Sequence, residues 1–176
     1  ANDGGGIYVN SGTVNISQTT ISGNLAAAAG AGIYVENNAS ADVTINNSTI
    51  TDNEATNDTD GGGIFVNGTN GVVTLTSTIV AGNTYNDDIT GINGPGSTGV
   101  DSDGYNLIGS ATNVTNGFPS TTGDQVGTHG APLASSLDPL DFNGGGLPTH
   151  GLSAGLAIDA GDNPDSLTED ARGSVR

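Results

Sequence analysis

The chain has 176 residues, of which 19 are acidic and two are basic, so its formal net charge is -17 at pH 7. Nucleic acids and anionic membranes are bound through basic surfaces, which this composition cannot supply. With 33% hydrophobic residues, no Trp and no Cys, the chain has neither the bulk for a thick globular core nor a disulfide. No apolar run reaches the ~18 residues of a spanning helix, so we expect no membrane insertion.

A phrase of glycines followed by alternating apolar residues occurs at residues 4–9, 30–35 and 61–66. Its apolar side chains alternate with the period of two that is typical of a β-strand with one buried face. We therefore expect a strand in each copy, with Ile7, Ile33 and Ile64 pointing inward.

A second phrase follows each copy and ends at an asparagine, with spacings of 29 and 30 residues between Asn24, Asn53 and Asn83. Short strands separated by Gly, Asn and Asp turns at this period predict an all-β fold, a right-handed parallel β-helix of about 30 residues per coil. In such a stack the three asparagines lie above one another. We expect them to form an axial ladder of amide hydrogen bonds.

The pattern is regular over residues 1–117 and irregular over residues 118–176, where prolines interrupt the apolar segments. We expect the second part to complete the same solenoid with looser coils and loops, as one domain. Residues 156–158, Leu-Ala-Ile, are its clearest candidate for a buried strand. Because residue 4 already opens a coil, we also expect the chain to be a processed piece of an exported protein.

Several motifs resemble secreted parallel β-helix proteins of the choice-of-anchor Q type. They are residues 104–109 (GYNLIG), 143–145 (NGG), 148–150 (PTH), 157–161 (AIDAG) and 170–173 (DARG). The repeated GGGIYV and ITDN phrases are also similar to the repeats of polymorphic outer-membrane proteins. These resemblances imply an exported, surface-associated, structural or adhesive protein and no particular reaction. Ala171 replaces the usual glutamine, and the closing strand after residue 173 is missing.

The alternative is a carbohydrate-active β-helix enzyme. Lyases of this shape resemble one another in using a basic residue on a coil face, but no Arg or Lys precedes Arg172. Hydrolysis requires two carboxylates across the scissile bond. The candidate pairs are Asp87 with Asp88, Asp101 with Asp103, and Asp138 with Asp141. Each pair also fits an ordinary turn, so we expect the chain not to be an enzyme.

Two acidic motifs suggest calcium as a cofactor. Asp58 and Asp60, and likewise Asp101 and Asp103, place two carboxylates two residues apart ahead of a glycine, where they could converge on a hard cation. The full EF-hand pattern is absent. Acidic turns without an ion are the other interpretation.

Three aromatic residues occupy the outward position of the glycine phrase. If Ile7 points inward, Tyr8 points outward, and Tyr34 and Phe65 follow it in register. Such a stripe can bind a polysaccharide or a protein partner. The alternative is that the rings only stack on one another and stabilise neighbouring coils.

The first coil carries no recognisable cap, so its strands are expected to be open to another chain. We expect the partner to be a copy of the chain, stacked end to end, or the rest of a longer surface protein. The sequence therefore predicts an extracellular or cell-surface structural or adhesive protein, with a polysaccharide-binding module as a further alternative.

Overall fold

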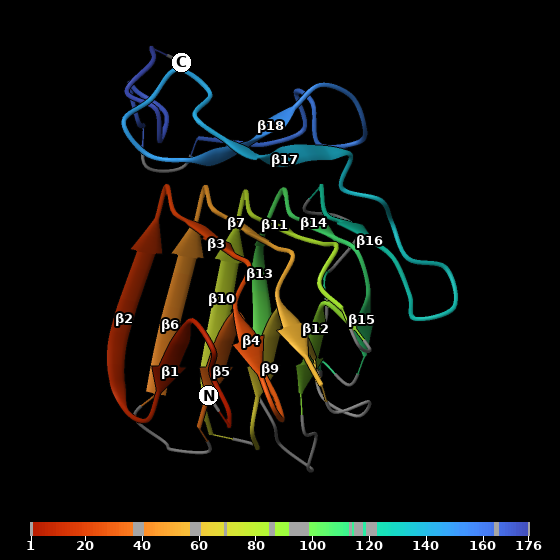
Figure 1. The fold of residues 1–176 in the computed structure, drawn as a ribbon. Helices are drawn as coiled ribbons and strands as arrows, with labels where there is room; N and C mark the ends of the chain where they lie inside the picture. The colour runs from red at the N-terminus through yellow and green to blue at the C-terminus, as the bar shows by residue number, and fades with distance from the viewer. Residues whose placement is uncertain are drawn as a thin grey trace.

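The computed structural model describes residues 2–36, 41–56, 61–68, 70–84, 87–91, 99–112, 114, 118, 123–163 and 166–175. These residues form an all-β fold dominated by three parallel sheets, and none of them lies in a helix (Figure 1). Each parallel sheet takes one strand from each successive segment of the chain. We call these segments repeats: the first contains β1 to β4, the second β5 to β8, the third β9 to β11 and the fourth β12 to β14.

The strand bounds follow the predicted period. The first sheet contains β1 (Ile7–Val9), β5 (Ile33–Val35), β9 (Ile64–Val66), β12 (Ile89–Gly91) and β15 (Ala111–Thr112). The second contains β2 (Gly12–Ser17), β6 (Ala41–Asn46), β10 (Val72–Thr76) and β13 (Val100–Gly104). The third contains β3 (Thr20–Ser22), β7 (Thr49–Thr51), β11 (Ile79–Val80), β14 (Leu107–Ile108) and β16 (Gln125–Val126). A short parallel pair joins β4 (Leu25–Ala26) to β8 (Glu54–Ala55).

The register confirms the predicted column of Ile7, Ile33 and Ile64 and forms a second column in the second sheet. In the first sheet the paired residues are Ile7, Ile33, Ile64 and Ile89. In the second sheet they are Val14, Val43, Val73 and Val100. Because each strand pairs with the equivalent strand of the next repeat, like side chains stack on like, and the β-branched ones pack well on the pleated surface.

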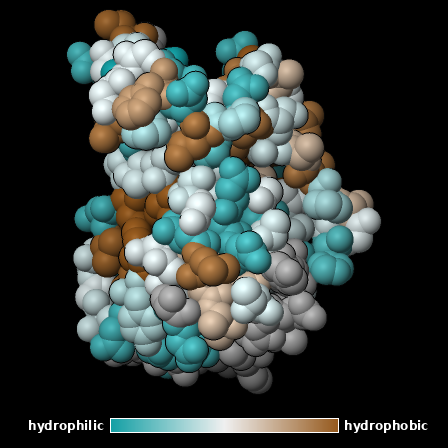
Figure 2. Space-filling view, viewed as in Figure 1, coloured by the Kyte–Doolittle hydropathy of each residue, from teal (hydrophilic) through white to brown (hydrophobic). Residues whose placement is uncertain are grey.

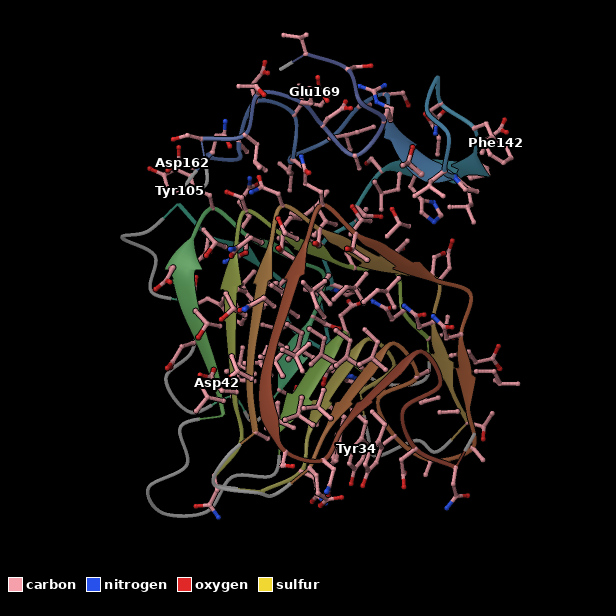
Figure 3. The ribbon with its side chains drawn as sticks, turned by 90° about the vertical axis from the view of Figure 1, so that its left-hand side faces the viewer. Tyr34, Asp42, Tyr105, Phe142, Asp162 and Glu169 are labelled. Carbon is pink, nitrogen blue, oxygen red and sulfur yellow. The ribbon has the colours of Figure 1, made fainter. Side chains whose placement is uncertain are left out.

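The core fills the space between the three sheets. Figure 3, which looks at the molecule from the first-repeat end, shows side chains from all three sheets meeting in this space. The inward residues of the second and third repeats are fully buried, among them Ile33, Ile45, Ile64 and Leu75. The core is thus thin in cross-section and continuous along the stack.

An antiparallel hairpin follows the parallel sheets and lies across the turns at their upper edge (Figure 1). It consists of β17 (Leu137–Asp141) and β18 (Thr149–Leu152). The expected strand at residues 156–158 is wrong, because these residues form a turn in which Leu156 and Ile158 are exposed. Gly155 and Asp159 on either side have positive φ angles of 106° and 56°, which bend the chain instead of extending it.

The chain then returns along the stack, beside the turns of the second and third sheets. The return segment comprises residues 156–163 and 166–169. Gln125 donates to the Leu156 carbonyl, the Asp162 amide donates to Ser77, and Gln18 donates to the Glu169 carbonyl. These contacts run from the last strand of the third sheet back to the first repeat. The labelled Asp162 and Glu169 of Figure 3 lie over this row of turns.

Candidate functional site

The turn after β3 is built around a left-handed residue followed by asparagine. Gly23, Asp52 and Gly82 have φ angles of 69°, 55° and 77° in the three successive repeats. The side-chain amide of the asparagine that follows reaches back to a carbonyl, as Asn53 Nδ2 does to the Thr51 oxygen at 3.0 Å. Such side-chain turns relieve the left-handed backbone and hold the amide in one orientation.

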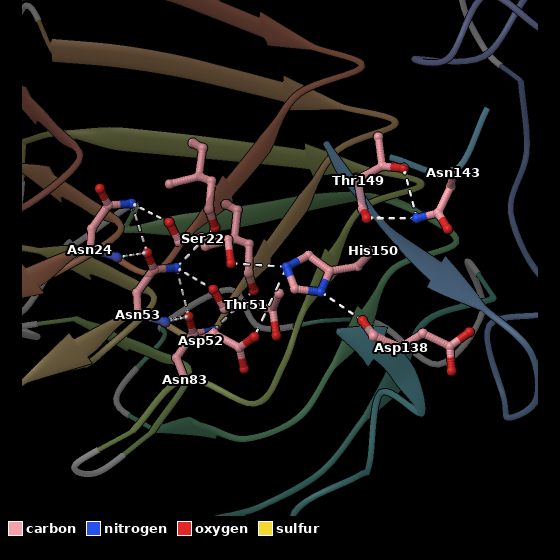
Figure 4. A network of polar contacts seen from close by, with 12 residues as sticks. Ser22, Asn24, Thr51, Asp52, Asn53, Asn83, Asp138, Asn143, Thr149 and His150 are labelled. Atoms are coloured by element: carbon pink, nitrogen blue, oxygen red, sulfur yellow. Dashed lines mark hydrogen bonds and ion pairs between the residues drawn. The ribbon is translucent and has the colours of Figure 1, made fainter. Parts of the chain in front are cut away.

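The asparagines form the axial ladder (Figure 4). Asn53 Oδ1 accepts from Asn24 Nδ2 at 2.8 Å and from the Asn24 backbone N–H at 3.1 Å. Asn83 Oδ1 accepts the same two bonds from Asn53 at the same distances. Every bond between two asparagines runs from the earlier repeat to the later one, so the ladder has a direction.

The ladder explains the glycine phrase of the sequence. A Cβ atom on Gly63 would lie 2.7 Å from Asn83 Nδ2, and one on Gly32 would lie 3.1 Å from Asn53 Nδ2. The last glycine of each phrase therefore leaves room for the amide of its own repeat. The two phrases that recur together in the sequence contact each other in the fold.

The ladder ends at a buried carboxylate, Asp88. Its Oδ1 accepts two hydrogen bonds from Asn83, at 2.8 and 2.9 Å, and its Oδ2 accepts the Ser110 N–H at 2.9 Å. Burial raises the pKa of this carboxyl, and the hydrogen bonds from Asn83 and Ser110 oppose the rise. A carboxylate accepts only, so the side-chain bonds of the ladder end at Asp88, whose backbone N–H still donates to Ser110 Oγ at 3.1 Å.

A second ladder, which the sequence reasoning missed, runs beside the turns between the second and third sheets. The Thr19 N–H donates to Ser48 Oγ, the Thr78 N–H to Asn106 Oδ1, and the Asn106 N–H to Asp124 Oδ1. This ladder also ends at a carboxylate. Its signal in the sequence is a Ser, Thr or Asn that stands two positions after the end of each strand of the second sheet, at residues 19, 48, 78 and 106.

The aromatic residues form a stacked column. The Tyr8 and Tyr34 ring centroids lie 5.1 Å apart and those of Tyr34 and Phe65 5.4 Å apart. The predicted exposed stripe is wrong for Tyr34 and Phe65, which are 6% and 3% exposed, whereas Tyr8 is 48% exposed. Each inner ring is covered by its neighbours, and only the first ring of the column presents a face to solvent.

The tyrosine hydroxyls have raised pKa values. The Tyr8 hydroxyl donates to the Glu36 carboxylate at 2.6 Å, and this hydrogen bond raises its pKa. Burial, with the nearby Glu36 charge, raises the pKa of Tyr34 to about 12. Both rings are therefore uncharged at neutral pH.

The predicted calcium residues are only partly described. Asp58 and Asp60 lie outside the described residues. Asp101 and Asp103 lie on β13, two positions apart on the outer face of the second sheet. Within the described ranges, no group of three or more His, Asp or Glu side chains is arranged to hold a metal ion.

A buried histidine fastens the hairpin to the first repeat (Figure 4). The His150 side chain is 2% exposed; its Nε2 lies 2.9 Å from Ser22 Oγ and its Nδ1 2.8 Å from the Asp138 carbonyl oxygen. Because a carbonyl only accepts, Nδ1 carries a proton, and in the neutral ring Ser22 donates to Nε2. Asp52 lies 4.0 Å from the same nitrogen. Residues 128 positions apart are joined here, which no sequence pattern indicated.

Two cavities flank the hairpin. One of about 410 Å³ is lined in part by His150 and Arg172, and the other, of about 480 Å³, by Asp88 and His129. Arg172 donates to Asp170 within the first cavity and lowers the pKa of that carboxyl, so its charge is compensated. In the second, Asp88 is already bonded to Asn83 and Ser110. His129 lies 3.4 Å from the buried Asp87, the other member of the predicted catalytic pair.

The first repeat presents an open face, which we call the first-repeat face. It consists of the outer edges of β1, β2 and β3 with the side chains of Tyr8 and Asn24, and none of the described strands pairs with these edges. Figure 2 shows apolar side chains reaching the surface in a hollow over β2, on the left of the view. Ile7 and Val14 are partly exposed, whereas their equivalents in the second repeat are fully buried.

Comparison with known proteins returned no relative: no family model, no curated protein and no solved structure matches the chain. In the described part of the chain there is also no helix that is long and apolar enough to cross a membrane.

Proposed function

We propose that the chain is an exported structural or adhesive element of a cell surface or extracellular filament, without enzymatic activity. It performs this role as a right-handed parallel β-helix of about 30 residues per coil. Its extracellular or cell-surface location belongs to the same proposal.

The two axial ladders are the observation that supports this proposal most strongly. The buried amides of Asn53, Asn83 and Asn106 are all bonded between successive repeats. Buried polar groups that bond to one another in this way stiffen a structure and fix one register. Hydrogen bonds of this kind suit a protein that must be long and rigid.

The stacking of like residues supports the same function. Paired strands from each repeat add backbone hydrogen bonds and a layer of β-branched side chains, so the fold extends by simple repetition. A rod of this kind suits a protein that spans a distance or carries surface groups. The acidic surface keeps such a rod dispersed.

Imaging tests the proposal. Antibodies against the folded chain should label the surface or extracellular filaments of the cells that produce it, as seen by immuno-electron microscopy. Purified chain incubated with acidic and neutral polysaccharides should release no new reducing ends or unsaturated products. Labelling confined to the cell interior contradicts the location. Product release that Asp101→Asn or Asp103→Asn abolishes would establish the enzyme instead.

A further inference from the structure

We propose that the first-repeat face is an assembly interface, and that its occupant is a further repeat of this same sequence type, laid in parallel register on β1, β2 and β3. The inference rests on the proposed structural function and names the partner of this face. Four features of the described residues support it: the open backbone edge, the end of the asparagine ladder, the aromatic column and the distribution of charge.

The backbone edge is prepared for parallel pairing. The Ile7 N–H donates to the Gly32 carbonyl and the Val9 carbonyl accepts from the Glu36 N–H, so these residues bond to the second repeat. Residues of a parallel strand alternate between the two neighbouring strands. Tyr8 therefore directs its N–H and C=O to the open edge. By the same alternation, starting from the bond of the Gln18 N–H to the Asn46 carbonyl, so do Thr13, Asn15 and Ser17.

The asparagine ladder begins at this face with an acceptor. Asn24 donates to Asn53, and among the described residues none donates to Asn24 Oδ1. At each later step this oxygen accepts both a backbone and a side-chain N–H from the asparagine of the preceding repeat. The partner that completes the ladder must therefore carry an asparagine after a left-handed turn residue.

The aromatic column ends at the same face. Tyr34 is covered by Tyr8 on one side and by Phe65 on the other. Tyr8 has a ring on one side only and is half exposed. A strand paired with β1 places its own middle residue over Tyr8, so the partner fits best with a Tyr or Phe at that position, as in the glycine phrases.

The strands of this face carry no charged side chain, a property that they share with β9, β10 and β11 of the third repeat. Of the 19 acidic residues of the chain, Asp3 alone lies within residues 1–35. The strands β1 to β4 carry no charge, whereas β6 and β8, their equivalents in the second repeat, contain Asp42 and Glu54. Natural sheets usually protect a free edge with charged residues, and interface cores are depleted of charge. The strands of this edge therefore lack the charges that protect a free edge, and the nearest carboxylates, Asp3 and Glu36, lie beside Tyr8.

The opposite end of a second copy does not supply the required donors. There the Ser110 N–H is already bonded to Asp88 Oδ2, and the Asn106 N–H to Asp124 Oδ1. The chain also folds over the last strands of the third sheet, where the Leu133 N–H donates to the Gly109 carbonyl. Among the described residues of that end, none offers an asparagine donor, so the partner is a repeat that carries one.

A tandem variant tests the inference. Residues 30–60 are duplicated ahead of Gly4, in place of residues 1–3, so that the junction of residues 60 and 61 is reproduced. The amides of Tyr8, Thr13, Asn15 and Ser17 should then exchange with solvent deuterium about 100-fold more slowly than in the unmodified chain. Amides of β10 serve as internal standards. The substitution Asn53→Asp, made only in the duplicated segment, leaves a side chain that cannot donate and should restore much of the exchange.

Unchanged exchange at these four amides in the tandem variant would overturn the inference. The unmodified chain is also followed by sedimentation over a wide range of concentration and should remain monomeric. Self-association that protects the same amides would identify the occupant as a second copy and overturn the inference as well. These outcomes do not depend on the proposed function. That proposal is contradicted only if the chain is found inside the cell or if it cleaves polysaccharide.

Discussion

At the scale of single residues, Asn53 is the best-satisfied member of the asparagine ladder. Its Oδ1 accepts two bonds from Asn24, and its Nδ2 donates to Asn83 and to the carbonyls of Ile21 and Thr51. The residue is fully buried. Its removal leaves several buried groups without partners, and each such group costs far more than a hydrogen bond exchanged with water.

We expect Asn53→Ala to lower the free energy of unfolding by about 3 kcal/mol, because buried donors and acceptors lose their partners. Asn24→Ala is the matched control. It stands at the first position, where nothing described donates to Oδ1, and should cost about 1 kcal/mol. Urea denaturation of both variants measures the difference. Equal losses of unfolding free energy in the two variants would show that an interior position of the ladder contributes no more to stability than the first position.

Asp88 gives stability a predictable dependence on pH. Burial raises its pKa above the ordinary value of 3.8, so the folded chain holds this proton where the unfolded chain has lost it. The contribution of the group to stability is complete below the unfolded pKa and is lost as the pH rises through the folded pKa. The wild-type chain should thus lose stability relative to Asp88→Asn between these two values.

Urea denaturation at a series of pH values measures this difference. Asp103→Asn, which removes an exposed carboxylate on β13, serves as the control for the loss of one negative charge. If Asp88→Asn followed the same pH dependence as the wild type, burial of Asp88 would not raise its pKa in the folded chain.

At the scale of elements, His150 determines how the hairpin of β17 and β18 is held. Its ring joins the Asp138 carbonyl of the hairpin to Ser22 of β3, and it is buried between them. The hairpin has only two strands, and isolated hairpins are marginal in water. Contacts to the turns below it therefore decide whether it stays in place.

We expect His150→Ala to loosen the hairpin while the parallel sheets remain folded. The amides of β17 and β18 should exchange at least about 10-fold faster, and those of β6 should be unchanged. His129→Ala is the matched control, because that ring is 68% exposed and contacts Asp87 only at 3.4 Å. Equal acceleration in both variants, or loss of β6 protection, would contradict a local role for His150.

At the scale of the whole molecule, the sequence predicts what repeats and misses what does not. The spacing of Ile7, Ile33 and Ile64 sets the register of the first sheet, because equivalent strands pair only where their inward side chains coincide. The asparagine ladder follows from the same period. The second ladder carries a weaker signal, since Ser, Thr and Asn alternate in the same role.

Contacts between distant and unrelated segments could not be predicted in this way. Ser22 and His150 have no common pattern, and the hairpin that joins them lies in the irregular part of the chain. The exposure of Tyr34 depends on what covers the ring from the side, which alternation along one strand does not report. The turn at residues 156–158 depends on Asp159 adopting a left-handed conformation that aspartate takes only in some settings.

The direction of the asparagine ladder limits how such a protein can change its length during evolution. Duplicating a repeat between Asn24 and Asn83 adds one more asparagine that both donates and accepts hydrogen bonds. The chain then becomes longer without the loss of any bond of the ladder. A unit copied beyond Asp88 meets a carboxylate side chain, which has no N–H to donate to the next asparagine. Natural variants that differ in length should therefore gain or lose whole units upstream of this aspartate.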